Sequence, residues 1–310
     1  MKKEQIGGVA SAIGAFTLWG FLPIYWKLIQ QVPALEILAH RIVWCLLFMG
    51  LVLFATRRIR SFRQETLIIV GQRKRFLGLI SAAVILSLNW LIYIWAVNNN
   101  HIVETSLGYY INPLISVFLG VFVLKERLTL WQTVAVVLAG LGVLNLTVNF
   151  GTFPWIAVSL AVSFGLYGLA KKILNIGALT SIMLETSLMT PLALVYLSYL
   201  QQKGTGTFDC SQPVLAGLLI GAGIVTAMPM VLFSNSAIQI SLTMLGFIQY
   251  LSPTIALFVG VFLYHEPFSL THLVSFSLIW LALTIFSLSQ TKAFAHVEAT
   301  VMRVLTKGKQ

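Results

Sequence analysis

Four ionisable side chains fall inside long apolar stretches of this sequence, where charge is unexpected. They are His40, Arg41, Glu104 and Glu185. A charged group within a lipid bilayer costs about 3 kcal/mol unless it is paired or hydrated, so such residues usually have a structural partner or a function. An arginine in this setting can bind an anion, and a carboxylate can take up and release a proton.

Arg41 has three interpretations. It lies near one end of its apolar stretch, so its long side chain can extend to the membrane surface. It can instead pair with Glu36, five residues earlier in the sequence. The functional interpretation is a cationic binding group that faces an internal cavity, and the sequence leaves the three open.

The two carboxylates are candidates for proton coupling. Glu185 is the first candidate, because it lies a short way inside its apolar stretch. Lys171 and Lys172 lie near the same end across a short connection, so a structural ion pair is the alternative. Glu104 is the second candidate, and its alternative role is to cap a helix N-terminus, where the helix dipole favours a carboxylate.

Polar residues also gather around two prolines within apolar stretches, Pro113 and Pro253. Proline has no N–H, so the carbonyls of Tyr109 and Gln249 lose their helical partners, and such groups are tolerated in a membrane only beside protein or a water-filled cavity. We therefore predict two helix breaks that line a cavity, with packing kinks as the alternative. The polar neighbours are Tyr109, Tyr110 and Asn112 in one stretch and Gln249, Tyr250 and Ser252 in the other.

Four further residues are predicted to line the same cavity. Most of the 8 tryptophans and 9 tyrosines fall near the ends of apolar stretches, where anchoring at the membrane interface is the default. Trp19, Trp90 and Tyr93 lie deeper, and Trp90 follows Asn89, a polar residue that lipid disfavours. A flat aromatic substrate could stack on these rings.

Membrane-spanning helices are the elements that must position these residues. Hydrophobic residues make up 58% of the 310-residue chain and charged residues only 9%, whereas soluble domains carry about 25% charge. We predict an all-α polytopic membrane protein whose first apolar stretch is retained as a helix. The ten predicted transmembrane helices are 6–26, 34–56, 76–98, 102–124, 130–149, 153–174, 178–200, 213–234, 241–264 and 270–291.

The basic residues predict the orientation of this chain, because lysine and arginine are retained on the cytoplasmic side during insertion. With both termini cytoplasmic, seventeen of the 20 basic residues fall on the inner side. They are Lys2, Lys3, Arg57, Arg58, Arg60, Arg63, Arg73, Lys74, Arg75, Lys125, Arg127, Lys171, Lys172, Lys292, Arg303, Lys307 and Lys309. The net charge of +11 is therefore explained by topology and anionic membrane lipid, and we expect no nucleic-acid partner.

An internal duplication divides the chain. The segment "LGYYINPLISVFLGVFVLKE" (107–126) matches "FIQYLSPTIALFVGVFLYHE" (247–266) at a shift of 140 positions, and a weaker match aligns Gly20 with Gly165 and Lys27 with Lys172. Each half then holds five helices, so the second half enters the membrane from the opposite side. Such inverted repeats are typical of secondary transporters. We predict repeats at 1–150 and 151–291, followed by a basic cytoplasmic tail at 292–310.

Other classes of protein are less well supported. The single aspartate, Asp209, lies in a predicted outer loop, and the sequence has no HExxH, GxSxG or Walker-type motif, so an enzyme or a primary pump is not expected. Cys45 and Cys210 fall in different environments, and we predict no disulfide, metal or cofactor. A channel or a scaffold that does not transport fits the same hydropathy.

The sequence resembles the EamA family of the drug/metabolite transporter superfamily, and in particular its RarD branch, over about residues 6–291. The matching motifs are "TLWGFLPIYWK" (17–27), "PALEILAHRIVW" (33–44), "LNWLIYIWAVNNNHIVETSLGYYINPL" (88–114), "MLETSLMTP" (183–191), "GIVTAMPM" (223–230) and "LGFIQYLSPT" (245–254). The resemblance implies two inverted EamA repeats and a transporter or permease of the bacterial inner membrane.

We therefore expect a secondary transporter that moves small metabolites or drug-like molecules, as permease or exporter, by alternating access. Proton coupling is one option for its energy source, beside exchange and facilitated transport. The sequence defines neither the substrate nor the direction of transport. It also leaves the oligomeric state open, with a monomer as the simplest case.

Overall fold

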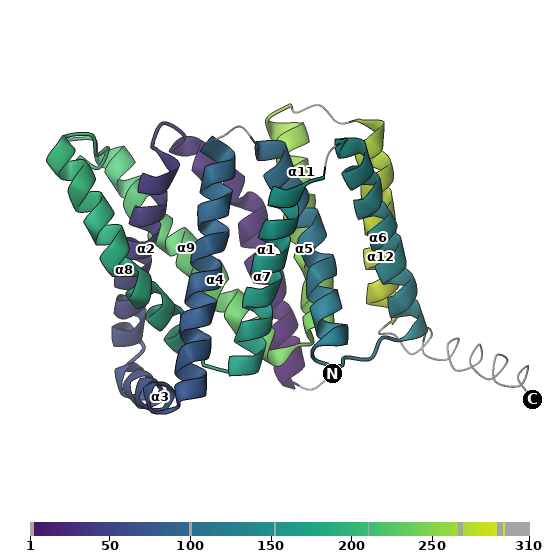
Figure 1. Ribbon diagram of the computed structural model, residues 1–310, viewed down its shortest axis with the longest axis horizontal. Helices are drawn as coiled ribbons and strands as arrows, with labels where there is room; N and C mark the ends of the chain where they lie inside the picture. The colour runs from purple at the N-terminus through teal and green to yellow at the C-terminus, as the bar shows by residue number, and fades with distance from the viewer. Residues whose placement is uncertain are drawn as a thin grey trace, which may run out of the picture.

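The computed structural model describes residues 3–98, 101–151, 153–209, 211–265, 269–289 and 294, and in these residues every regular element is helical (Figure 1). The predicted basic tail at 292–310 falls almost wholly outside this part of the chain. The helices are α1 (Lys3–Leu28), α2 (Ala34–Ala55), α3 (Ile59–Gly71), α4 (Arg73–Asn98), α5 (Ile102–Phe122), α6 (Leu130–Phe150), α7 (Trp155–Leu174), α8 (Ala178–Lys203), α9 (Pro213–Gln239), α10 (Leu242–Gln249), α11 (Leu251–Phe258), the π-helical turn η1 (Val259–Leu263) and α12 (Leu270–Ser289).

Ten helical segments are long and apolar enough to cross a membrane, which confirms the predicted number. One of the ten, Leu242–Leu263, is composite, because α10, α11 and η1 follow one another within it. The chain also contains α3, a 13-residue amphipathic helix in a segment that the sequence analysis assigned to a loop.

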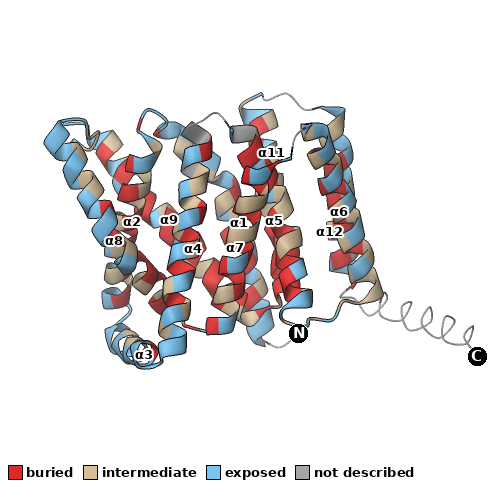
Figure 2. Cartoon of the chain, viewed as in Figure 1, coloured by how far each residue is buried: buried red, intermediate tan, exposed pale blue. Residues whose placement is uncertain are grey.

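The surface of the bundle is apolar, as a lipid environment requires. Phe54 and Val195 are each 70% exposed, and Leu51 is 63% exposed. Figure 2 shows that exposed residues follow the outward faces of the helices while buried residues face neighbouring helices. Because water would disfavour such a surface, these outward faces are the lipid-contacting surface of a multi-pass membrane protein.

The helices alternate in direction, so their connections divide between two ends of the bundle (Figure 1). The start of α1, the end of α12 and all of α3 lie at one end, here called the terminal end; the opposite end is called the far end. Most described basic residues belong to connections or helix ends at the terminal end. They are Lys3, Arg57, Arg58, Arg60, Arg63, Arg73, Lys74, Arg75, Lys125, Arg127, Lys171 and Lys172.

Local sequence signals explain several helix boundaries. Thr129 and Gln132 form a capping box at the start of α6, and the Ser241 hydroxyl accepts the Met244 N–H, 3.1 Å away, at the start of α10. Gly151 and Gly204 end α6 and α8 with φ of 86° and 66°, a conformation that glycine adopts without strain.

Contacts between helices follow a regular pattern across the two halves of the chain. α1 packs on α9 and α7 packs on α4; α1 packs on α11 and α7 on α5; α2 packs on α9 and α8 on α4. Three further pairs, α6 with α12, α2 with α8 and α5 with α10, each join helices of the same rank in their halves. Every one of these contacts is therefore reproduced when the two halves are exchanged.

Two glycines fit the same exchange at the level of single atoms. A Cβ on Gly20 would lie 2.6 Å from the Cβ of Ile255, and a Cβ on Gly165 would lie 2.7 Å from Cγ2 of Ile115. The internal duplication aligns Gly20 with Gly165 and Ile115 with Ile255. Each of the two aligned glycines therefore packs against the aligned isoleucine of the opposite half.

The apolar core has one large cluster toward the terminal end and several small ones toward the far end. The large cluster, including Phe16, Met49, Leu79, Ile182 and Phe233, joins the helices other than α6 and α12, which pack with part of α10 in a second cluster. Toward the far end, smaller separate clusters form around Ile29, Ala39, Ala96 and Leu107. The helices are therefore packed together more completely at the terminal end.

Candidate functional site

Arg41 lies on the second turn of α2 and contacts residues of three other helices. Its Nε donates a hydrogen bond to Oγ1 of Thr226 on α9, at 2.9 Å. Its Cζ lies 4.8 Å from the ring centroid of Trp26 and 5.5 Å from that of Trp90, within the range of cation–π attraction. The side chain is only partly exposed.

The proposed pairing of Arg41 with Glu36 is wrong. Glu36 is buried, accepts the backbone N–H of Thr207 at 2.6 Å, and lies 4.0 Å from Nε2 of His40. Phe208 covers the His40 ring with centroids 5.0 Å apart. Glu36 and His40 thus hold the loop between α8 and α9 against α2, a role that the sequence did not suggest because the loop is 171 residues away.

Two tyrosines complete the surroundings of Arg41. The rings of Tyr93 on α4 and Tyr109 on α5 are 6.5 Å apart, and both residues lie near the guanidinium. Tyr109 is 52% exposed, and Trp90 and Tyr93 are partly exposed. We call Trp26, Arg41, Trp90, Tyr93 and Tyr109 the Arg41 cluster. It unites four of the ten predicted cavity residues with Trp26, which the sequence did not single out.

A narrow cavity extends from the Arg41 cluster into the middle of the bundle. It is bounded by α2, α4, α8 and α9, and its lining includes Arg41, Cys45, Trp90, Glu185 and Thr226. Its volume is about 20 Å³, room for roughly one water molecule. The two charged residues that the sequence singled out in the second and seventh spans therefore face one space.

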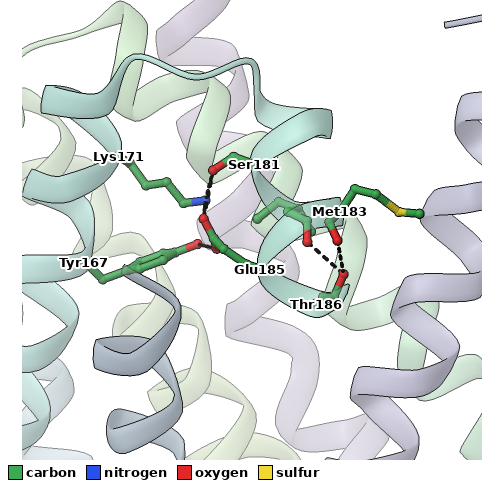
Figure 3. A network of polar contacts seen from close by, with 7 residues as sticks. Tyr167, Lys171, Ser181, Met183, Glu185 and Thr186 are labelled. Atoms are coloured by element: carbon green, nitrogen blue, oxygen red, sulfur yellow. Dashed lines mark hydrogen bonds and ion pairs between the residues drawn. The ribbon is translucent and has the colours of Figure 1, made fainter. Parts of the chain in front are cut away.

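Glu185 is held in a buried polar network at the other side of this cavity (Figure 3). Lys171 forms an ion pair with Oε1, while the Tyr167 hydroxyl donates to Oε2 and the Ser181 hydroxyl to Oε1, both at 2.8 Å. Lys171 also donates to Ser181 at 2.7 Å. The predicted contact with Lys171 is confirmed. Lys172 instead donates to the carbonyls of Ala237 and Ile240 at the end of α9.

Asn112 and Gln249 are buried, which contradicts their predicted place in a water-filled cavity. They are 3% and 6% exposed, and Nε2 of Gln249 donates to Oδ1 of Asn112 at 2.5 Å. Asn112 also donates to the carbonyl of Ala161 at 3.0 Å. The two side chains therefore hydrogen-bond to each other, and Asn112 also hydrogen-bonds to α7. The contact between them links α5 of the first half to α10 of the second.

Four other predicted cavity residues also take part in packing. Asn89 is buried and donates to the carbonyl of Leu160 and the hydroxyl of Ser163 on α7, at 3.0 and 2.8 Å. Trp19 packs against Phe16, Phe164 and Phe233. Tyr110 and Tyr250 belong to an apolar cluster with α6 and α12.

The two prolines act differently. Near Pro253 the helix is interrupted, because α10 ends at Gln249 and α11 begins at Leu251. Near Pro113 the predicted break is absent, and α5 continues through the proline to Phe122.

Two carboxylates near the ends of α5 cap other helices. Glu104 accepts the N–H of Ile156 in the first turn of α7 at 2.8 Å and lies 3.7 Å from Nδ1 of His101. Glu126, just beyond α5, accepts the N–H groups of Leu242 and Thr243 at 2.7 and 2.9 Å. Glu104 is thus a cap, but of α7 rather than of its own helix, whereas Glu266, the repeat partner of Glu126, lies outside the described residues.

A second, larger cavity lies at the terminal end. Its volume is about 410 Å³, it is open to the outside, and it is lined by α3, the end of α2, the start of α8 and part of α9. Leu53, Arg58, Glu65, Thr180 and Asn235 are among its lining residues. Met49, 1% exposed, lies one helical turn from Cys45 of the central cavity and from Leu53 of this one. Ile182, also 1% exposed, lines the central cavity and lies two residues from Thr180 of this one.

Comparison with known proteins identifies the family. The model of the EamA-like transporter family matches residues 6–148. The uncharacterized transporter YojE of Bacillus subtilis (strain 168) is 44% identical over 289 residues, which cover 93% of this chain and 96% of YojE. The chain belongs to the EamA-like transporter family.

Further relatives agree with this assignment. Protein RarD of Escherichia coli (strain K12) is 42% identical over 284 residues, which cover 92% of this chain and 95% of that protein. A crystal structure with 15% sequence identity superposes with a TM-score of 0.70 over 93% of this chain and 99% of its own. The resemblance to the RarD branch is confirmed, and the chain is a membrane transporter by family, whereas the distant structure supports the fold alone.

Proposed function

We propose that this protein is a secondary transporter of the bacterial inner membrane that moves a small metabolite or drug-like molecule, as permease or exporter, by alternating access. One observation carries the proposal: Arg41 and Glu185, charged residues within membrane-spanning helices, line a single cavity between helices of both halves. Charged groups inside a membrane protein usually mark a substrate or ion pathway.

The packing of the helices supports an inverted repeat. When the two halves are exchanged, each of these helix contacts corresponds to an observed contact. In the same way, the contact of Gly20 with Ile255 corresponds to that of Gly165 with Ile115. Five spans in each half place equivalent helices in opposite directions. Arg41 and Glu185 occupy the same position in this scheme, each seven residues after the start of its helix, α2 or α8. In inverted-repeat transporters the binding site lies at the interface of the repeats near mid-membrane.

The two cavities support alternating access. Met49 and Ile182 lie along α2 and α8 between lining residues of the two cavities, and both are buried in the large apolar cluster. The far end has only smaller clusters, between which the Arg41 cluster is partly exposed. We infer that this conformation is closed at the terminal end, and that separation of Met49 from Ile182 joins the two cavities in the alternate state.

The charge distribution supports an orientation with the terminal end in the cytoplasm. The basic residues of α3, of its flanking segments and of the connection between α5 and α6 lie at this end. Lysine and arginine on short loops are retained on the cytoplasmic side. The conformation is then outward-facing.

Transport by purified protein in liposomes tests the proposal. A panel of labelled small molecules is offered with and without a pH gradient, and uptake is compared with that of liposomes without protein. Saturable uptake that accelerates when unlabelled substrate is present on the opposite side indicates a carrier. Flux that does not saturate indicates a channel, and the absence of flux for the whole panel indicates a protein that does not transport; either outcome contradicts the proposal.

A further inference from the structure

Arg41 lacks a carboxylate partner among the described residues. The close carboxylate contacts there are those of Glu36 with His40, Glu104 with His101 and Glu185 with Lys171, and none of them involves Arg41. Arg41 instead donates to Thr226, a neutral hydroxyl. A buried or half-buried cation in a membrane protein is normally balanced by a negative group, so the central cavity carries an unbalanced positive charge.

The guanidinium keeps donors for such a negative group. Arginine has five N–H donors in a planar fork, and the one on Nε is used by Thr226. The side chain is partly exposed, and its hydrogen bond to Thr226 is the only one that the guanidinium forms among the described residues. Other charges of the cavity do not compete, because Glu185 is satisfied by Lys171, Tyr167 and Ser181.

Aromatic rings surround this charge on the side that is accessible. Trp26 and Trp90 lie close to the guanidinium, and Tyr93 and Tyr109 adjoin them, with Tyr109 half exposed. These rings offer apolar faces but no charge of their own. A ligand that satisfies the site therefore combines one negative charge with a flat apolar body.

We propose that the Arg41 cluster is the binding site for a small monocarboxylate with a flat apolar group, in which the carboxylate pairs with the Arg41 fork and the apolar group packs on Trp90, Tyr93 and Tyr109. The inference rests on the proposed transport function and names its substrate class. A single guanidinium balances a single negative charge, which favours a monocarboxylate over a phosphate ester with two charges.

Binding of three probes with the same ring system tests the charge preference. The probes are 2-naphthoate, its neutral amide and the cation 2-naphthylmethylammonium, each titrated by calorimetry into the purified full chain at pH 7. A charge-assisted hydrogen bond should make 2-naphthoate bind about tenfold to a hundredfold more tightly than the amide. Equal affinity for anion and amide, or a preference for the cation, overturns the proposal.

Substitutions of Arg41 test its part in that preference. Arg41→Gln should bind 2-naphthoate and the amide equally, while Arg41→Lys, which keeps the charge without the fork, should retain part of the preference. Lys203→Gln removes an exposed charge near the far end and should leave all three affinities unchanged. An Arg41→Gln protein that keeps the wild-type preference overturns the proposal even if 2-naphthoate binds.

Flux measurements separate this inference from the transport function. If 2-naphthoate binds with the expected preference but no compound is transported, the anion site stands and the transporter proposal fails. If other compounds are transported and Arg41→Gln transports them normally, the transporter proposal stands and the monocarboxylate site fails.

Discussion

At the scale of residues, the pair of Glu185 and Lys171 is the most constrained feature of the bundle. Both side chains are 2–3% exposed, and each is bound by Ser181 as well as by the other. Proton coupling would require Glu185 to release Lys171 during the transport cycle. A structural pair would remain closed throughout, and the two roles make different predictions for a double substitution.

Glu185→Gln should leave the Lys171 ammonium buried without a carboxylate, which costs about 3–5 kcal/mol of stability in comparable buried pairs. The double variant Lys171→Gln/Glu185→Gln removes both charges and should recover most of that stability. If Glu185 carries the proton, the double variant should still fail to accumulate substrate against a gradient while it retains exchange. Thermal unfolding and liposome uptake of the two variants measure these effects, and accumulation by the double variant would show that the pair is structural.

Cysteine labelling distinguishes the buried link from the open cluster. In a background without Cys45 and Cys210, a cysteine at Tyr109 should react rapidly with a small water-soluble reagent, because Tyr109 is 52% exposed and lies near Arg41. Cysteines at Asn112 and Gln249 should react at least about tenfold more slowly, as expected for sites exposed only by local opening. Equal rates at the three positions would restore the original prediction that Asn112 and Gln249 line the cavity.

Sequence reasoning located the ionisable residues correctly but not all of their partners. The short separation of Lys171 and Glu185 predicted their contact, because the connection between α7 and α8 is brief. Asn112 was predicted to face a water-filled cavity because a polar side chain in an apolar stretch needs a hydrogen-bond partner. Either water or protein can provide that partner. Its actual partner, Gln249, is 137 residues away, and no local pattern specifies that contact.

At the scale of elements, a close approach between α2 and α9 positions Arg41. A Cβ on Gly223 of α9 would lie 2.4 Å from the backbone carbon of Trp44 and 2.5 Å from the backbone nitrogen of Cys45 on α2. Thr226, which binds Arg41, is three residues further along α9. The absence of a side chain at Gly223 therefore permits the contact between Arg41 and Thr226.

Gly223→Ala should force α2 and α9 apart, because backbone atoms cannot rotate away as a side chain can. Overpacking of this kind costs about 1–3 kcal/mol, and it should also weaken transport by displacing Thr226 from Arg41. Gly217→Ala on the same helix is the matched control, since no atom lies within 4 Å of its added Cβ. Thermal unfolding and uptake compare the two; equal stability of both variants would contradict the close approach.

The sequence predicted the membrane-spanning helices more accurately than α3 and the helix breaks, for a physical reason. Runs of about 20 apolar residues predict membrane helices without knowledge of their partners. The amphipathic α3 was missed because Arg60, Arg63 and Glu65 reduce its average hydropathy, although its apolar residues recur at helical spacing. The continuity of α5 through Pro113 depends on its packing against α7 and α10, which the proline alone does not reveal.

At the scale of the whole molecule, the orientation makes a direct prediction. A cysteine at Thr205, in the exposed loop after α8, should react with an impermeant reagent added outside intact cells. A cysteine at Arg60, on exposed α3, should react only after the membrane is opened. Reaction of both sites from the same side would contradict the ten-span topology and the inverted repeat together.

The contacts of α5 have a mechanical consequence. This helix is attached at three depths: Glu104 binds α7 at one end, Asn112 binds α7 and α10 midway, and Glu126 binds α10 at the other end. The central cavity is bounded by a different set of helices, α2, α4, α8 and α9. The attachments hold α5, α7 and α10 together, and α7 is in turn bound to α4 by Asn89 and to α8 by Lys171. A movement of the cavity helices relative to α5 must therefore either carry α7 with them or break these buried contacts of α7.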